Sequence, residues 1–221
     1  MTSYSVTSIQ DQAQIYAAAW ASNDVIYWAS RSKSKLFKGH KSSGSWVSTS
    51  LSGAGSLSST YGMTSSLLEV SADQSYLLYG YGIGRSACCI MQYTFSDDTF
   101  VPRIGNCNSQ GFVDGAGTTA KFRFINDIAI SADGSYAYVA DTDNSRIRHI
   151  DMTNNQVTST CSICGSTQFG RPRGLRFTSD FKYLIVSTFE NREIRSINME
   201  TEEVFKLLSD SDSSLRGPKQ L

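Results

Sequence analysis

One pattern recurs four times along the chain and constrains the fold more than any other feature. Each copy contains a short apolar strand, a turn rich in Asp, Asn, Gly and Ser, a second apolar strand, a polar loop and a third strand. The turn and second strand of the copies lie at residues 23–30, 71–80, 131–140 and 178–187. A spacing of roughly 45 to 60 residues is typical of blade-like repeats. Because a lone unit of this kind would expose two faces and two edges, the copies have to pack side by side.

The third and fourth copies align without a gap. Four identities recur at one constant offset, and the pairs are Asn144 and Asn191, Ile147 and Ile194, Arg148 and Arg195, and Ile150 and Ile197. Apolar runs begin the copies near residues 15–19, 67–70, 128–130 and 175–177, and closing strands lie near 46–49, 100–101, 157–160 and 204–207. Asp133-Gly134 is a strong hairpin signal, because glycine tolerates positive φ. The pattern predicts an all-β fold of four antiparallel, four-stranded sheets.

The stretch from Gly111 to Asp151 carries the most specific motifs. It contains Asp-Gly-Ala-Gly at 114–117 and Asp-Thr-Asp-Asn at 141–144. This stretch resembles the NHL repeat, a blade of a β-propeller. The resemblance implies a ring of about six blades, within the range known for propellers. The chain supplies four, so we expect one incomplete propeller spanning 1–221, with approximate blades at residues 10–55, 62–106, 111–165 and 170–210. The first two copies lack the Asp-Gly-x-Gly motif.

Composition limits the classes of function. Apolar residues make up 40% of the 221 residues, which is enough for a packed core. With 20 basic and 20 acidic residues, the chain lacks the strong positive field of a general nucleic-acid binder. No apolar run reaches the roughly 18 residues that span a bilayer, and no basic region followed by a hydrophobic one marks a signal peptide. The sequence does not identify a compartment.

The five cysteines leave several readings open. They are Cys88, Cys89, Cys107, Cys161 and Cys164, an odd number and too few to build a scaffold of this length from disulfides. Cys88 and Cys89 lie in an apolar run, which predicts core positions. Cys161 and Cys164 fit strand-end thiols, a disulfide between themselves or with Cys107, or part of a metal site.

Polar loops follow the second strand of the third and fourth copies at equivalent positions. Their candidate contact residues are Asp141, Asp143, Asn144, Glu190 and Asn191. These side chains also suit a purely structural role, in which they satisfy backbone groups of their own loops. Propellers usually carry their binding loops on a rigid scaffold. We therefore expect an NHL-repeat binding or scaffolding module with a protein partner and no cofactor, rather than an enzyme.

A metal-dependent hydrolase or lyase is the alternative. Glu69, Asn126 and Asp127 fall on the predicted inner strands. Propeller lactonases, which share this architecture, hold a divalent metal in the central channel with Glu, Asn and Asp, and the resemblance implies the same role for these three residues. Polar inner-strand residues also simply line a wet channel. Two histidines are too few for the zinc site of the propeller lyases.

RNA binding is a further alternative. The densest basic stretch contains Arg31, Lys33, Lys35 and Lys38, with Phe37 between the last two. Cations attract the phosphate backbone, and an aromatic ring stacks on bases. The alternative interpretation is structural, because lysines on an exposed blade edge discourage edge-to-edge pairing with another chain. The open blade edges of an incomplete propeller predict, in addition, that the chain self-associates.

Overall fold

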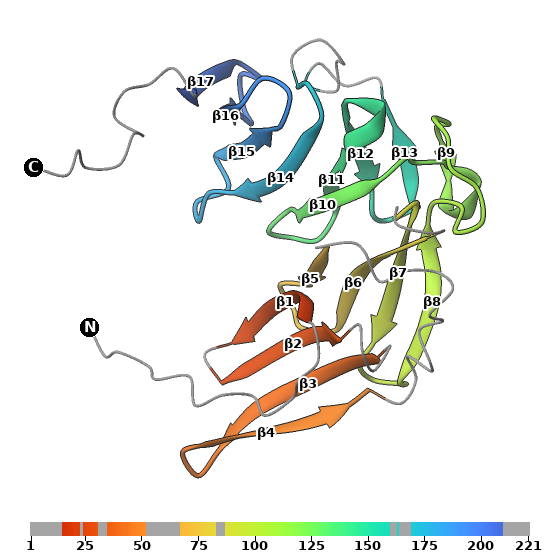
Figure 1. The fold of residues 1–221 in the computed structure, drawn as a ribbon, viewed down its shortest axis with the longest axis vertical. Helices are drawn as coiled ribbons and strands as arrows, with labels where there is room; N and C mark the ends of the chain where they lie inside the picture. Colours follow the sequence, from red (N-terminus) through yellow and green to blue (C-terminus); the bar gives the residue numbers. More distant parts are fainter. Residues whose placement is uncertain are drawn as a thin grey trace, which may run out of the picture.

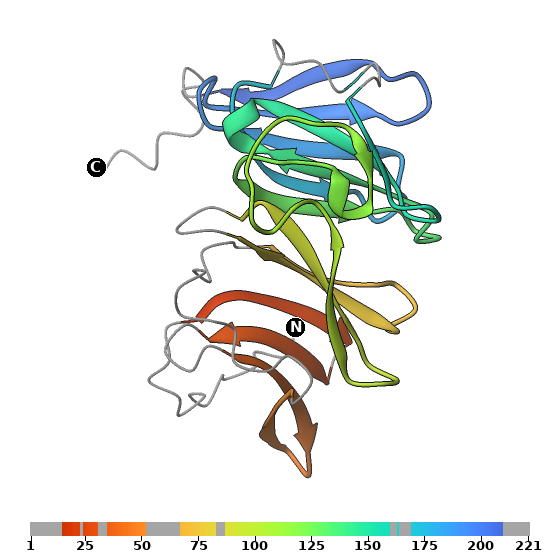
Figure 2. The same cartoon turned by 90° about the vertical axis from the view of Figure 1, so that its right-hand side faces the viewer.

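The computed structural model describes residues 15–22, 24–30, 35–51, 67–82, 87–159, 163 and 169–209. These residues form four antiparallel sheets arranged as the blades of a β-propeller (Figure 1). The sheets follow one another along an arc, and the turned view shows them stacked in chain order (Figure 2). The all-β prediction is therefore confirmed. Among the described residues, no helix has the length and apolar character needed to cross a bilayer.

Every sheet is built mainly from strands that are consecutive in the sequence. The first contains β1 (Ile15–Ser22), β2 (Val25–Ser30), β3 (Lys35–Ser42) and β4 (Ser45–Ser50). The second contains β5 (Leu68–Val70), β6 (Tyr76–Tyr81), β7 (Cys89–Thr94) and β8 (Thr99–Ile104). The third contains β10 (Ile125–Ile130), β11 (Tyr136–Asp141), β12 (Arg146–Asp151), β13 (Gln156–Thr158) and, at its outer edge, β9 (Gly115–Ala116). The fourth contains β14 (Pro172–Phe177), β15 (Tyr183–Thr188), β16 (Glu193–Asn198) and β17 (Val204–Ser209).

The first strand of each sheet lies on the inner side of the arc. β1, β5, β10 and β14 contact one another in this order (Figure 1). Two 3-10 turns, η1 (Gly117–Thr119) and η2 (Thr142–Asn144), complete the regular structure of the described residues. The inner strands predicted from the apolar runs are thus the strands that the structure places innermost.

The third and fourth sheets repeat their turn geometry residue by residue. Non-glycine residues with positive φ recur in pairs, namely Phe124 (61°) and Arg171 (47°), Ser145 (53°) and Arg192 (51°), and Asn155 (59°) and Glu202 (60°). The offset within each pair is that of Asn144 to Asn191. Left-handed geometry costs a residue with a side chain roughly 1–2 kcal/mol. Its recurrence at equivalent positions shows that the blade geometry, rather than local preference, sets these turns.

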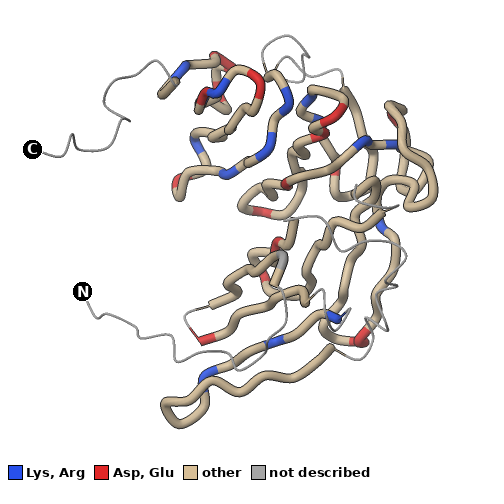
Figure 3. The backbone as a smooth tube through the Cα atoms, viewed as in Figure 1, with Lys and Arg blue, Asp and Glu red and all other residues tan. Residues whose placement is uncertain are grey.

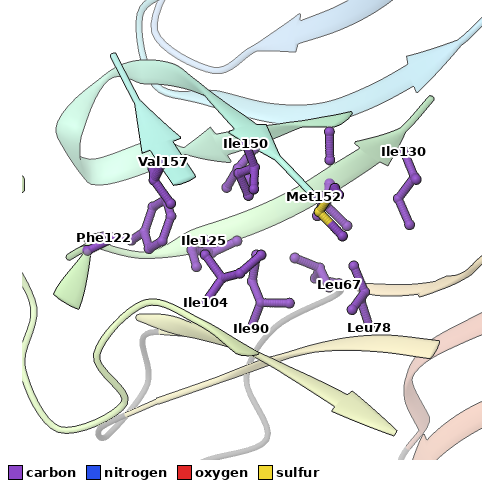
Figure 4. Packing of buried hydrophobic residues seen from close by; sticks show 14 of the residues in the cluster. Leu67, Leu78, Ile90, Ile104, Phe122, Ile125, Ile130, Ile150, Met152 and Val157 are labelled. Carbon is purple, nitrogen blue, oxygen red and sulfur yellow. The ribbon is translucent and has the colours of Figure 1, made fainter. Parts of the chain in front are cut away.

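Apolar side chains pack between neighbouring sheets. Three buried clusters, one at each junction between successive sheets, form the core of the described residues. Figure 4 shows the second junction, where Leu78 and Ile90 of the second sheet face Ile125 and Ile150 of the third. Side chains alternate between the two faces of a strand. The second and third sheets therefore pack one set of side chains against the preceding sheet and the other set against the following sheet.

The junction between the third and fourth sheets shows how the two sets meet. We call the side of a sheet that faces its predecessor the incoming face, and the side that faces its successor the outgoing face. The outgoing face of the third sheet and the incoming face of the fourth form one cluster, which contains Ala129, Tyr138, Ala140, Ile147, Leu175, Leu184, Val186 and Ile197. Ile147 is 0% exposed there, whereas Ile194, its equivalent on the outgoing face of the fourth sheet, is 36% exposed.

A disulfide joins Cys89 of β7 to Cys107. Cys89 and Cys88 are both buried, as the apolar run predicts, but Cys89 is not a core thiol. β7 pairs with β8, and the turn after Ile104 brings Cys107 back beside the start of β7. This geometry gives Cys107 a different partner from the Cys161 or Cys164 considered from the sequence, and both of these lie outside the described residues. The Cys88 thiol donates to the Cys107 carbonyl oxygen at 3.4 Å.

Loss of this disulfide should destabilise the second sheet. A closed loop of this size restricts the unfolded chain by about 3 kcal/mol, so Cys107→Ala should lower the free energy of unfolding by about that amount. Urea unfolding followed by circular dichroism measures the change, with the wild-type protein under reducing conditions as the matched comparison. A peptide map that shows Cys89 and Cys107 both alkylated in the unreduced wild-type protein would refute the pairing.

Matched substitutions at Ile147 and Ile194 test the packing at the third junction. Ile147→Ala should lower the free energy of unfolding by about 2–5 kcal/mol, because it opens a cavity in a closed cluster. Ile194→Ala, at the equivalent position of an uncovered face, should cost less than about 1 kcal/mol. Both are measured by urea unfolding in dilute solution. Equal losses at the two sites would contradict the difference in burial.

Candidate functional site

The loops that follow β11 and β15 lie on the same end of their blades. We call residues 141–145 and 188–192, together with residues 171–173 that contact them, the loop face. Asp143, in the first loop, forms an ion pair with Arg171, which directly precedes β14 of the next blade, at 2.5 Å. Thr142 donates to the carbonyl oxygen of Pro172 at 2.5 Å. These contacts join the two blades where their loops emerge.

Asp141 holds the first loop from inside. Its buried carboxylate accepts hydrogen bonds from the backbone N–H of Arg123 at 2.8 Å, from the Asn144 amide at 2.8 Å and from Arg148 Nη1 at 3.0 Å. Burial raises the pKa of Asp141 to about 6, against the pull of these three donors. Asp141 therefore supports the loop face and is not part of its surface.

Arg148 ties the connector before β10 to the same network. Its guanidinium is fully buried and donates to the carbonyl oxygens of Val113 and Lys121 at 3.1 and 3.3 Å. It also pairs with the Asp114 carboxylate and lies 5.1 Å from the centroid of the Phe122 ring. The Asp-Gly-x-Gly motif and the Asp-x-x-Asn motif are thus two halves of one structural unit.

The remaining candidates of the loop face differ in exposure. Asp143 is partly exposed and pairs with Arg171. Asn144 donates to the Gly111 carbonyl oxygen at 2.9 Å. Glu190 and Asn191 are exposed. Gly170 lies beside them, since a Cβ there would be 2.9 Å from the Asn191 amide oxygen and 3.0 Å from the Glu190 Cβ. The structure therefore brings Asp143 and Asn144 together in one loop and Glu190 and Asn191 in the next.

The loop face also carries a contact between Arg173 and Phe189 that the repeat pattern of the sequence did not predict. Phe189 is exposed, and the guanidinium of Arg173 lies 4.1 Å from its ring centroid, within cation–π distance. Arg171 contacts the same ring at 5.7 Å. The equivalent residues of the third blade are Asn126 and Thr142, whose side chains share a hydrogen bond of 2.7 Å. Because neither position keeps its residue type between the blades, the repeat alone does not identify the pair.

The inner strands hold a separate cluster of charges. Arg176 of β14 donates to Glu69 of β5 at 2.9 Å and lies 3.8 Å from Asp127 of β10. Burial raises the pKa of both carboxyl groups, and the Arg176 charge opposes this rise. A hollow of about 210 Å³ beside them is lined by Glu69, Arg176, Phe177 and neighbouring turn residues. β14 carries two arginines, Arg173 and Arg176, and residues of both charge signs occur in the third and fourth blades (Figure 3).

This cluster bears on the metal-dependent alternative. Glu69 and Asp127 both lie near one guanidinium nitrogen of Arg176, at 2.9 and 3.8 Å, and the Asn126 amide donates to Thr142. The part of the chain that the structure describes contains no group of three or more His, Cys, Asp and Glu residues arranged to hold a metal ion. The assignment of Glu69, Asn126 and Asp127 as metal ligands stays a prediction.

Of the basic stretch, Arg31 and Lys33 lie outside the described residues. Lys35 is exposed at the start of β3, and the Lys38 ammonium lies 5.9 Å from the centroid of the Tyr27 ring. Lys35 and Lys38 project to opposite faces of the strand, because their separation is odd. These two lysines therefore do not form one basic face.

Solved structures resemble this arrangement, although a scan against protein-family models found no match and a search of curated proteins found none. An auxiliary nutrient binding protein from Bacteroides thetaiotaomicron VPI-5482 matches with a TM-score of 0.64 and 14% identity, over 87% of this chain and 48% of its own. TolB from Acinetobacter baumannii matches with a TM-score of 0.60 and 15% identity, over 89% and 44%. The β-propeller domain of Myceliophteria thermophila Cps50 (Swd1) matches with a TM-score of 0.56 and 12% identity, over 92% and 62%.

These similarities show the fold alone, which is that of a β-propeller. The chain spans about half the length of the first two of these structures. The binding or assembly that their names describe belongs to those proteins.

Substitutions of Asp141 and Asp143 distinguish a residue that supports the first loop from one that lies on its surface. Asp141→Asn should lower the free energy of unfolding by about 1–3 kcal/mol, because the amide NH2 would face donors from Arg123, Asn144 or Arg148 that the carboxylate now accepts. The matched variant Asp143→Asn breaks a partly exposed ion pair and should cost less than about 1 kcal/mol. Urea unfolding at neutral pH measures both. A loss at Asp141 as small as that at Asp143 would contradict the supporting role of Asp141.

Proposed function

We propose that this chain is an NHL-type propeller module that binds a protein partner through its loop face. The residues from Gly111 to Asp151 support the NHL assignment, since both of their motifs take part in the network around Arg148. The recurring turn geometry of the third and fourth blades supports it further. The proposal covers the described blades and concerns binding, not catalysis.

One observation carries the binding role, namely that the loop face is rigidly supported from inside. The buried contacts of Asp141 fix the first loop, and the ion pair between Asp143 and Arg171 fixes it to the next blade. The second loop, which carries the exposed Glu190 and Asn191, is held by its backbone, because the N–H groups of Phe189 and Glu190 donate to the carbonyl oxygens of Arg171 and Gly170 at 3.1 and 3.2 Å. Loops held in this way lose little freedom when a partner binds.

The charges of the loop face favour a protein over a nucleic acid. Asp143 and Glu190 lie among Arg171 and Arg173, so a phosphate backbone would meet carboxylates as well as guanidinium groups. A partner protein can place charges of both signs opposite this pattern. The charges of the inner strands also favour binding over metal-dependent catalysis, because Arg176 offsets part of the negative charge of Glu69 and Asp127.

The test compares two charge reversals in the fourth blade. Immobilised wild-type chain, Glu190→Lys and Glu200→Lys capture proteins from an extract of the source cells, and isotope labelling quantifies each captured protein. Glu200 lies in the turn after β16, at the opposite end of the blade from the loop face, and is exposed like Glu190. We expect specific partners to fall about tenfold or more with Glu190→Lys and to stay unchanged with Glu200→Lys.

The opposite pattern would refute the proposal. Partners lost with Glu200→Lys alone would assign binding to the turn end, and partners retained by both variants would exclude the loop face. Circular dichroism of each variant confirms that the sheets are intact.

A further inference from the structure

The outgoing face of the fourth sheet lacks the cover that the equivalent face of the third sheet has. Ala129, Tyr138 and Ile147 of the third sheet are buried against the fourth. The equivalent positions of the fourth sheet are Arg176, Ile185 and Ile194. On the same side of the fourth sheet, according to the strand register, Tyr183 is 37% exposed and Phe205 is 47% exposed. Apolar residues thus project from a face to which the described chain adds no further sheet.

The polar side chains of the third and fourth blades differ in the same way as their apolar residues. Three side chains of the third blade reach the fourth, since Asp127 accepts from the Leu175 N–H at 2.9 Å, Thr142 donates to Pro172 and Asp143 pairs with Arg171. The residue equivalent to Asp143 in the fourth blade is Glu190, which keeps the carboxylate. Within the described residues, Glu190 forms no ion pair. Among the same residues Arg173 also forms no ion pair, and its guanidinium lies over the Phe189 ring.

We propose that this outgoing face is an interface with a second copy of this chain, in which the two fourth sheets pack face to face. Tyr183, Ile194 and Phe205 form its apolar centre, continuing the type of contact that joins the third and fourth sheets. Glu190 and Arg173 give its rim both signs of charge. A two-fold axis brings identical surfaces together, so a surface with both signs can complement itself. The apolar centre lies on a sheet face, whereas Glu190 and Arg173 at the rim also belong to the loop face. The proposal does not rest on the function proposed above, because the residues that its test alters, Ile194 and Phe205, lie outside the loop face.

The size of the face sets the strength of the contact. Each of its four strands has six residues, and strands about 4.8 Å apart with about 3.3 Å per residue cover about 400 Å² on each copy. The total of about 800 Å² is below the roughly 1,200 Å² of stable complexes. We therefore expect a weak, reversible dimer.

Sedimentation velocity of the full chain from about 1 to 100 μM tests the proposal. The mass should rise from 24.2 kDa towards twice that value and stop there, because a face-to-face contact is closed. Ile194→Glu and Phe205→Glu should each stay monomeric over this range. The matched control is Val101→Glu, which places the same charge on an exposed apolar residue of β8 in the second sheet and should dimerise like the wild type.

Other outcomes overturn the proposal. A wild-type chain that stays monomeric, or a Phe205→Glu variant that dimerises as strongly as Val101→Glu, leaves the face without this partner. Growth beyond two copies would indicate head-to-tail contact between the fourth sheet of one copy and the first sheet of the next. In that case Trp20→Glu, which alters a large apolar residue of β1 that is 64% exposed, would block association as well, whereas a face-to-face dimer is insensitive to it.

Discussion

Apolar packing between neighbouring sheets is the interaction on which the rest of the structure depends. Each four-stranded sheet has two faces, and it cannot cover either of them with its own strands. Leu184 and Val186 of β15 are fully buried because the third sheet covers them. Burying a side chain of this size contributes about 1.5–3 kcal/mol. Each sheet therefore depends on its neighbours for stability, and a sheet at the end of the series has one face that depends on something else.

A buried ion pair between Arg148 and Asp141 then holds the loop after β11 in place. Arg148 and Asp141 are both fully buried, and removing two charges from water carries a large desolvation penalty. Further hydrogen bonds offset part of that penalty, namely those from the backbone of Arg123 to Asp141 and from Arg148 to the carbonyl oxygens of Val113 and Lys121, although Arg148 Nε is buried without a partner. The result is a loop whose position relative to its blade is closely specified. A surface held in this way suits recognition of a partner.

The sequence predicted the parts of the fold that repeat. Alternation and turn residues located the four sheets and their inner strands, and the constant offset between Asn144 and Asn191 matched equivalent loops. Contacts between distant residues were not predictable from one sequence. Nothing local indicates that Asp141 is buried against Arg148, that Cys89 rather than Cys161 or Cys164 bonds Cys107, or that Arg176 reaches Glu69 across an intervening blade. The candidate site shows the same division, since its loops were located and its arginine and aromatic contacts were not.

A double-mutant cycle across the third junction tests the packing of blade on blade most directly. Tyr138 of β11 and Phe177 of β14 belong to different sheets, and their ring centroids lie 6.3 Å apart. The single variants Tyr138→Leu and Phe177→Leu and the double variant keep the residues apolar while removing the ring contact. The account predicts a coupling of about 0.5–1.5 kcal/mol in the free energy of unfolding. Losses that add to within about 0.3 kcal/mol would contradict it, because the two sheets would then not be packed against each other at this junction.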